Sequence, residues 1–374
     1  MMPSSQHRQT ADAINPSSYP EMHIEMHHPK RIEPKTLDRY LEQGWYRMVQ
    51  SIFTCRFVMM GGDLHSALWT RLDLSDYRFR KSLRKLMRRN ARQFEITCEP
   101  ATLDAESEAL FQRYRTSFRG ELSESLRDSL YGDSGRAVYN TWRFSIRDGG
   151  RLVALSFFDL GQDSMLSVMG IYDPDYSQHS LGFTTMLLEI EYGIKAGLRY
   201  FYPGYVSPGY PVFDYKLRVG NVEWYEPEQD RWLPWSDVRE AELPAACIKT
   251  ALAEVQSELH ELGVESRLRM YPPYRVASLD RRLDLCLKQP LFVECHPERQ
   301  DSFCMLITYD FLSENYRLEL CLRYADISDQ LGEPETKPDG PVPCLELLQG
   351  VMRLGEATSA SAIARTTQRL GSVV

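Results

Sequence analysis

The spacing of apolar residues predicts two amphipathic helices in the middle of the chain. The first covers residues 105–118, where apolar side chains recur at helical intervals. The second begins after Ser180, a residue type that caps helices, and ends at Gly197, a residue type that suits a helix C-terminus. The expected apolar faces consist of Leu110, Phe111, Tyr114 and Phe118 in the first helix, and of Phe183, Met186, Leu187, Ile190 and Ile194 in the second.

Short apolar runs with strand character surround these helices. Residues 139–147 and 152–160 flank an Asp-Gly-Gly turn, a pattern that predicts a β-hairpin. A further strand is expected at 165–172, before the second helix, and another at 198–205, after it. Two hairpin strands followed by strand, helix and strand predict a mixed α/β sheet with flanking helices.

The ends of the chain differ from this middle part. The first 35 residues are rich in Ser, Pro, Gln and His and show no periodicity, so we expect a disordered tail. After Asp237 the pattern predicts a helix at 245–262, three strands and a Pro-rich linker at 332–343. The strands are expected at 291–295, 303–309 and 317–324, and a short helix at 360–370. The expected segments are a tail at 1–35, a small N-terminal module at 36–99, an α/β domain at 100–236 and a C-terminal α+β region at 237–374.

Composition is that of an ordinary globular protein, with 43% apolar and 26% charged residues. No apolar run approaches the length of a membrane span, and the N-terminus lacks the pattern of an export signal. We therefore expect a cytoplasmic protein that does not bind membranes. Its eight cysteines include no CxxC pair, which is typical of reduced thiols in that compartment.

Positive charge is concentrated in one stretch of an acidic chain. The net charge is −8, yet residues 78–92 contain eight of the 44 basic residues and no acidic one. The rest of the chain then carries 36 basic against 52 acidic residues. A charged helix face is usually a solvated surface, but eight uncompensated positive charges favour a polyanion partner such as RNA.

Acidic and phenolic residues gather around the start of the second expected helix. Asp159 and Asp173 lie at or beside strand ends, close to a helix N-terminus whose free N–H groups attract anions. Such a site suits a substrate with an anionic and a cationic end. Each Asp either holds an ammonium group or only solvates a strand end or shapes a turn. Tyr172 and Tyr205 either donate to a substrate carbonyl or are half-buried strand aromatics.

The order of these motifs resembles a known family. Residues 172–216 read YDPDYSQHSLGFTTMLLEIEYGIKAGLRYFYPGYVSPGYPVFDYK and are similar to the C-terminal half of the aminoacyl-tRNA–protein transferases, the arginyl and leucyl enzymes of the N-end rule. Upstream, LDRYLEQGWYRM at 37–48 and RFRKSLRKLMRRN at 78–90 resemble further elements of that family. The likeness covers about residues 37–235. It implies a catalytic half with the fold of the Gcn5-related N-acyltransferases (GNAT).

The resemblance also implies an activity and a set of site residues. Such an enzyme forms an amide bond between an aminoacyl group carried by tRNA and an amine of a protein or peptide. Because the aminoacyl ester is already activated, placement and proton transfer suffice, and no cofactor is expected. The implied catalytic residues are Asp159, Tyr172, Asp173 and Tyr205; the substrate-binding residues are Asp175, Ser180, Leu181, Gly182, Tyr215 and Lys216; and the tRNA-binding residues are Lys81, Arg84, Lys85, Arg88, Arg89 and Arg92. Asp214 departs from the family pattern and adds a carboxylate near the site, so we expect it among the substrate-binding residues as well.

Two other functions stay open from the sequence. An acyl-CoA-dependent N-acyltransferase of the same fold would carry a glycine-rich pyrophosphate loop where this chain reads His179-Ser-Leu-Gly-Phe-Thr, and its single glycine disfavours CoA. The third reading is a non-catalytic RNA- or protein-binding descendant. The metal-binding cysteines of the family are missing, since Cys55 has no partner, and His23, His27 and His28 lie in the expected tail. We therefore expect no metal.

Overall fold

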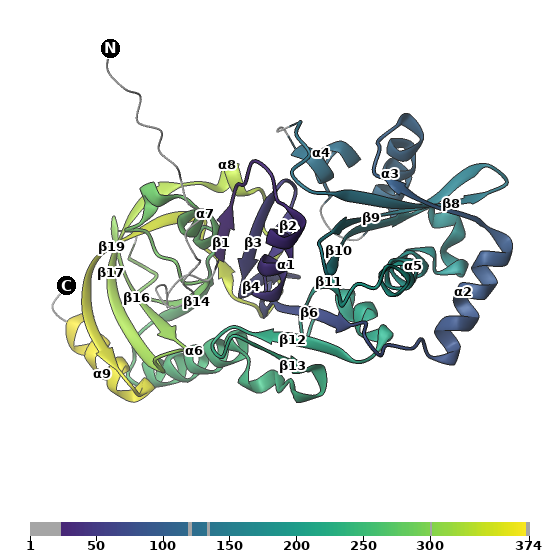
Figure 1. The fold of residues 1–374 in the computed structure, drawn as a ribbon. Coiled ribbons are helices and arrows are strands. Elements are labelled where there is room, and N and C mark those ends of the chain that lie inside the picture. Colours follow the sequence, from purple (N-terminus) through teal and green to yellow (C-terminus); the bar gives the residue numbers. More distant parts are fainter. Residues whose placement is uncertain (1–23, 119–121, 133–134, 300, 372–374) are drawn as a thin grey trace, which may run out of the picture.

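The computed structural model describes residues 24–118, 122–132, 135–299 and 301–371. These residues form two lobes, each built on its own β-sheet (Figure 1). The N-terminal strands and the first helix lie between the two lobes (Figure 1). No helix in the described ranges is long and apolar enough to cross a membrane.

The larger sheet holds the segment from which most of the site residues were predicted. In spatial order its strands are β13 (Arg231–Pro234), β12 (Val222–Glu226), β6 (Leu68–Asp73), β11 (Tyr200–Val206), β10 (Ser164–Tyr172), β9 (Arg151–Leu160), β8 (Thr141–Asp148) and β7 (Glu95–Pro100). Neighbours are antiparallel except β10 and β11, which run parallel. Gly149 and Gly150, both with positive φ, form the predicted turn between β8 and β9.

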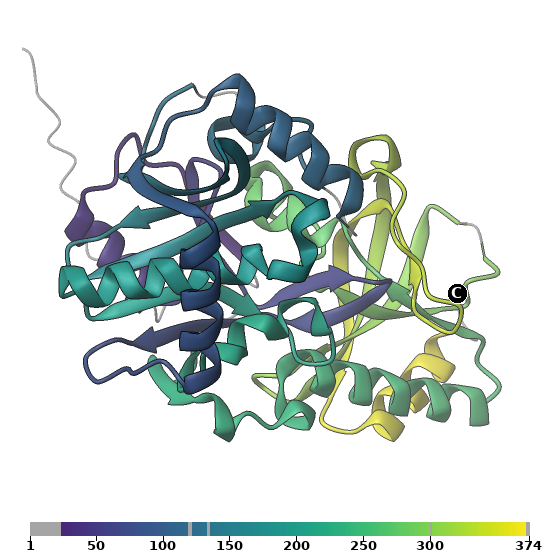
Figure 2. The same cartoon turned by 90° about the vertical axis from the view of Figure 1, so that its right-hand side faces the viewer.

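Helices cover both faces of this sheet (Figure 2). On one face, α5 (Leu181–Ala196) and α2 (Lys81–Gln93) pack into a common core with the strands. On the other face, α3 (Ala105–Ser117) and α4 (Leu126–Tyr131) form a second core. Gly197, with a φ of 72°, ends α5 as predicted. The expected mixed α/β sheet with flanking helices, including strand–helix–strand across α5, is therefore confirmed.

The expected boundary near residue 100 runs through this sheet. β6 lies between β12 and β11, and β7 pairs with β8, although both strands belong to the segment expected as a separate module. Long-range strand pairing, which local patterns do not encode, joins the two segments. The other N-terminal elements are α1 (Pro34–Glu42) and a small sheet of β1 (Ile24–His27), β3 (Ser51–Cys55) and β2 (Tyr46–Met48).

Residues 24–35, which we expected in a disordered tail, are part of the fold. Ile24 pairs with Cys55 in the sheet, and both belong to one buried cluster. The His27 ring lies 4.5 Å from the ring centroid of Trp45. These contacts join the segment to the module that follows it. Residues 1–23, including His23, lie outside the described ranges.

The second lobe is built from the C-terminal region. Its sheet has the order β18 (Val342–Pro343), β14 (Ser266–Met270), β15 (Leu291–Cys295), β16 (Phe303–Asp310), β17 (Asn315–Asp326) and β19 (Glu346–Ala357). The helices are α6 (Pro244–Glu261), α7 (Tyr274–Leu279), α8 (Ser328–Leu331) and α9 (Ala360–Gly371). Phe57 and Leu64, from the hairpin of β4 (Phe57–Met60) and β5 (Asp63–Ser66), enter its core. The N-terminal module therefore packs against both lobes.

Candidate functional site

The two parallel strands at the centre of the large sheet separate part-way along their length. β10 and β11 pair only from Ser164 to Leu166 and from Tyr200 to Tyr202. Beyond that point, irregularities after Ser167 in β10 and before Gly204 in β11 interrupt the pairing of each strand with its other neighbour. We call the region between Ser167 and Gly204 the strand opening. The Tyr46 hydroxyl reaches it and donates a hydrogen bond to the Ser167 carbonyl.

A buried lysine lies beside the strand opening. Lys216 belongs to the turn of 3₁₀ helix η4 (Pro211–Val219) that follows β11, and its Nζ donates to the Tyr205 carbonyl at 2.8 Å. A Cβ atom on Gly204 would lie 3.1 Å from both Nζ and the Tyr46 hydroxyl, and the φ of 95° at this residue also favours glycine. Burial lowers the pKa of Lys216 to about 7. Near neutral pH much of this amine is uncharged and able to accept a proton.

The start of α5 forms the other side of this region. Leu181 is buried, and Gly182 lies against the Tyr172 ring, to which a Cβ would approach within 3.0 Å. The Tyr172 and Tyr114 rings are 5.4 Å apart. Ser180 does not cap the helix as predicted, because its backbone is left-handed, with a φ of 52°, and its side chain makes no capping hydrogen bond. The dipole of this sixteen-residue helix still favours an anion at its start.

Asp159 is fully buried and has its own cationic partner. Its carboxylate accepts from Arg47 Nη1 at 2.8 and 3.0 Å and from the Thr141 hydroxyl at 2.6 Å. Arg47 also donates to the carbonyls of Val49 and Leu130. This ion pair connects β2 of the N-terminal module to β9. The substrate role expected for Asp159 stays a prediction, and these contacts give the carboxylate a structural partner.

Asp173 is also paired. Its side chain accepts from Arg113 Nε at 3.0 Å and from Arg151 Nη2 at 2.7 Å, while Asp173 itself is buried. Burial alone would raise its pKa, but the hydrogen bonds from Arg151 and the Asp175 backbone, with the charge of Arg113, lower it overall. Asp175 is exposed and lies 3.9 Å from Arg151. The expectation that Asp173 or Asp175 holds an ammonium group stays a prediction.

The remaining predicted residues lie near the end of β11 and in η4, at different depths. Tyr205 packs against Phe213, with ring centroids 4.9 Å apart, and Tyr215 and Asp214 are exposed on η4. Burial, and after it the phenol of Tyr215 and the carboxyl of Glu189, raise the pKa of Tyr46. Tyr46 and Glu189 are therefore part of the same buried polar region, although neither was predicted from the sequence.

The sequence pattern gave no indication that Glu189 belongs to the site, and the reason is physical. It lies on α5 outside the predicted apolar stripe, where a glutamate is typical of solvent-exposed surface. In the fold it is 0% exposed. Burial raises the pKa of its carboxyl to about 8. The one sequence feature that could have indicated its burial is the position of a charged residue type within an otherwise apolar segment of the helix.

The comparisons with known proteins agree with the resemblance seen in the sequence. A family model described as arginine-tRNA-protein transferase, C terminus, matches residues 106–226. The aspartate/glutamate leucyltransferase of Ruegeria pomeroyi is 30% identical over 205 residues, which are 50% of this chain and 69% of that protein. The protein of the same name from Leptospira interrogans is 27% identical over 235 residues, 59% of this chain and 88% of its own. The chain belongs to the aminoacyl-tRNA–protein transferase family.

The solved structures that match this chain are more distant in sequence. The C-terminal domain of a putative lysylphosphatidylglycerol synthetase from Agrobacterium fabrum is 13% identical, covers 38% of this chain and 46% of its own, and has a TM-score of 0.28. A GCN5-related N-acetyltransferase from Kribbella flavida is 12% identical, with coverages of 73% and 53% and a TM-score of 0.24. This chain thus spans about half the length of each. The assignment of the large sheet as a mixed α/β sheet with flanking helices rests on the observed strand order.

The basic stretch of this transferase forms α2, on the same face of the sheet as α5. All six residues predicted to bind tRNA are exposed: Lys81, Arg84, Lys85, Arg88, Arg89 and Arg92. Arg89 Nη2 also donates to the His179 carbonyl at 3.2 Å, next to the start of α5. The positive surface and the helix start at the strand opening are therefore directly connected.

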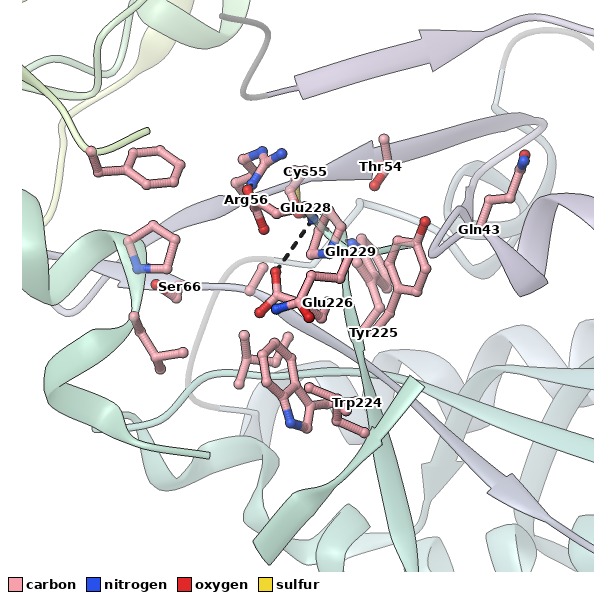
Figure 3. A pocket seen from close by; sticks show the side chains of 18 of the residues that line it. Gln43, Thr54, Cys55, Arg56, Ser66, Trp224, Tyr225, Glu226, Glu228 and Gln229 are labelled. Atoms are coloured by element: carbon pink, nitrogen blue, oxygen red, sulfur yellow. Dashed lines mark hydrogen bonds and ion pairs between the residues drawn. The ribbon is translucent and has the colours of Figure 1, made fainter. Parts of the chain in front are cut away.

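A separate cleft of about 810 Å³ lies next to the N-terminal module (Figure 3). Glu226 lines it together with Trp224 and Tyr225, and Arg56 forms an ion pair with Glu228 there. None of the residues predicted to be catalytic, substrate-binding or tRNA-binding lines this cleft. Trp69 lines it too and stacks on Tyr46 at 5.2 Å, so this indole lies between the cleft and the strand opening.

Proposed function

We propose that this member of the family transfers an aminoacyl group from a charged tRNA to an amine of a protein or peptide at the strand opening. The observation that carries this proposal is Lys216, a buried amine with a pKa lowered to about 7, next to Gly204 and the Tyr46 hydroxyl. A base that is partly unprotonated at neutral pH is what an ammonium nucleophile requires before it can attack an ester.

In the proposed reaction the neutral acceptor amine attacks the ester carbonyl carbon of the aminoacyl-tRNA. A carbon–nitrogen bond forms, the carbonyl oxygen gains negative charge, and Lys216 accepts the proton that the amine loses. The tetrahedral intermediate collapses when the carbon–oxygen bond to the terminal ribose breaks. That ribose oxygen takes up the proton, so charge and atoms balance and no covalent enzyme intermediate forms.

The basic face of α2 supports the choice of tRNA as the donor. It lies on the same side of the sheet as α5, and Arg89 joins it to the turn before α5. Phosphates bound along α2 and the aminoacyl end at the strand opening would then share one side of the sheet. We place this reaction in the cytoplasm, where charged tRNA is available, with the tRNA and an acceptor polypeptide as partners.

The relatives suggest which substrates to test first. Proteins named aspartate/glutamate leucyltransferase match this chain, so leucyl-tRNA and acceptors that begin with Asp or Glu are the first candidates. An acyl-CoA donor is disfavoured because Leu181 and Phe183 are buried around Gly182 and the turn has a single glycine.

The deciding experiment offers the full-length protein a pool of charged tRNAs and peptides with different N-terminal residues. Mass spectrometry of the peptides then reports whether an amino acid is added, which one, and to which N-terminus. We expect a mass increase of one aminoacyl residue that RNase treatment of the donor abolishes. Product formed from acetyl-CoA alone, unaffected by RNase, would overturn the proposal in favour of an acyl-CoA enzyme.

A further inference from the structure

Three carboxyl groups are buried in the large sheet and its helices, and two of them are neutralised by arginine. Asp159 is paired with Arg47, and Asp173 with Arg113 and Arg151. Glu189 differs from both. Among the described residues, neither of its carboxyl oxygens has a hydrogen-bond partner, and the residue is 0% exposed.

An unpaired buried carboxyl is costly. Leaving a buried polar group without a partner forfeits its hydration with nothing in return, and the loss is larger for a charged group. Proteins keep such groups where a ligand supplies the missing partner or where the group has a chemical role. We therefore consider Glu189 a candidate for contact with a hydrogen-bond donor that belongs to a bound ligand.

The position of Glu189 along α5 places it at the start of the strand opening. Three other positions of the helix meet β10 in turn: Gly182 faces Tyr172, Thr185 lies over Gly170, and Gly193 lies over Met165. Glu189 falls between the last two. Burial raises its pKa overall, and the hydroxyls of Ser167 and Ser156, which are near the carboxyl but outside hydrogen-bonding geometry, act to lower it. Ser167 is the β10 residue at which the opening begins.

The groups that face Glu189 come from several elements and carry no compensating positive charge. After burial, the carboxyl of Glu189 is a further cause that raises the pKa of Cys98 in β7, of Tyr46 in β2 and of Tyr215 in η4. Phenols and a thiol are neutral near pH 7. The surroundings therefore favour a cationic or hydrogen-bond-donating ligand group over an anionic one.

We propose that Glu189 binds the α-ammonium group of the aminoacyl residue carried by the donor tRNA. This inference rests on the proposed function. In an aminoacyl ester a single carbon separates the α-amine from the carbonyl that reacts, so the residue that holds the amine must lie next to the reaction site. The acceptor amine is the less suitable occupant, because it must be neutral to attack and pairing with a carboxylate would keep it protonated.

The carboxyl and the α-amine then share one proton. In the absence of substrate the proton is on Glu189 near neutral pH, since burial raises the pKa of that carboxyl to about 8. When the α-amine binds in its neutral form, it takes up this proton, and the resulting ammonium group pairs with the carboxylate through a charge-assisted hydrogen bond. Uncharged tRNA and N-acylated aminoacyl-tRNA lack this ammonium group, so the site would discriminate against both.

Equilibrium binding of leucyl-tRNA, N-acetylleucyl-tRNA and uncharged tRNA, measured without acceptor, tests the assignment. Because the α-ammonium is common to all aminoacyl-tRNAs, the test does not depend on which amino acid is transferred. We expect the wild-type protein to bind leucyl-tRNA about tenfold more tightly than the N-acetylated form, the scale of one charge-assisted hydrogen bond. Glu189→Gln should lose this preference, and its affinity for uncharged tRNA should not change.

Glu191→Gln is the matched control. It lies on the same helix, is half-buried and is paired with Lys195 at 2.9 Å, so it should bind all three tRNAs as the wild-type protein does. Glu189→Asp serves as a second variant, which keeps the acid but withdraws it by one methylene and should weaken the preference in part. Thermal unfolding of each variant shows whether it is folded.

The outcomes separate this inference from the proposed function. Equal wild-type affinity for leucyl-tRNA and its N-acetylated form, or a preference that survives in Glu189→Gln, overturns the assignment of Glu189 even if transfer occurs. Absence of transfer from every charged tRNA overturns the proposed function instead. A preference lost only in the Glu189 variants, with transfer in the wild-type protein, supports both.

Discussion

The side-chain amide of Asn90 joins the basic helix to the start of α5. Its Nδ2 donates to the His179 carbonyl at 2.9 Å and to the Thr184 hydroxyl at 2.7 Å, and Asn90 is fully buried. Asn90, together with Arg89, thus holds the exposed cations of α2 in a fixed relation to the start of α5. We therefore expect Asn90 to affect the rate of transfer although it contacts neither substrate.

Asn90→Ala should separate tRNA binding from catalysis. The change leaves the exposed cations of α2 in place but removes two buried hydrogen bonds, at a cost of about 1–3 kcal/mol. We expect tRNA affinity within about twofold of wild type, because binding depends mainly on phosphate contacts. The kcat for transfer should fall at least about tenfold, because the start of α5 is no longer fixed. Gln93→Ala, at the exposed end of the same helix, is the control, and an unchanged kcat in Asn90→Ala would contradict the prediction.

Neutralising the exposed cations of α2 should flatten the salt dependence of tRNA binding. The variant replaces Lys81, Arg84, Lys85 and Arg88 by Gln and keeps Arg89, which bonds to His179. Each phosphate contact that is lost should reduce the slope of log K against log salt by about 0.7–0.9. Filter binding at several salt concentrations measures the slope. Replacing Arg365 and Arg369 of α9 by Gln should leave it unchanged, and an equal slope in both variants would show that α2 is only solvated surface.

The rate of transfer should depend on the protonation of Lys216. In the proposed reaction the neutral amine is the active form, and burial lowers the pKa of Lys216 to about 7. The kcat/KM should therefore rise with pH across about 6–8 and level off above it. In Lys216→Met the rate should be at least about a hundredfold lower, with no such rise, because the proton acceptor is missing. Lys195→Met, an exposed lysine of α5, should keep the wild-type profile.

The same lysine should make the protein less stable at neutral pH. Because its pKa is lowered from 10.5 in the fold, the unfolded chain binds a proton between about pH 7 and 10.5 that the native state does not bind. The contribution of Lys216 to stability therefore rises with pH in this window, by up to about 1.4 kcal/mol per pH unit. Denaturant unfolding should show Lys216→Met to be more stable than wild type at pH 7, with the difference shrinking towards pH 10. A difference that is constant across the window would contradict the buried, neutral form.

Asp173→Asn distinguishes a structural role from a substrate-binding one. Its pKa is lowered in the fold, so its stabilising contribution is present above the ordinary value near 3.8 and is lost as pH falls below it. We expect the variant to be about 1–3 kcal/mol less stable at pH 7 and the difference to disappear at low pH. Arg151→Gln should reproduce part of the loss. If transfer instead falls about a hundredfold with unchanged stability, Asp173 binds substrate as the family resemblance implies.

The sequence by itself determined the local elements and the family. Helical and strand periodicities near α3, α5 and the β8–β9 hairpin depend on side chains close in sequence, and they agree with the structure to within a few residues. The basic residues of α2 were also visible, because a charge excess needs no tertiary information. The family resemblance also pointed to Tyr205 and Lys216, and both lie beside Gly204 at the strand opening.

Only the tertiary structure decided which polar groups already have partners. Asp159 is linked to Arg47 across 112 residues and Asp173 to Arg113 across 60, separations at which a local pattern carries no information about pairing. Glu189 is polar in type and lies outside the apolar stripe, yet the packing of α5 against β9 and β10 buries it. Burial and ion pairing, and with them the pKa values of Lys216 and Glu189, depend on contacts between distant segments, which the fold alone brings together.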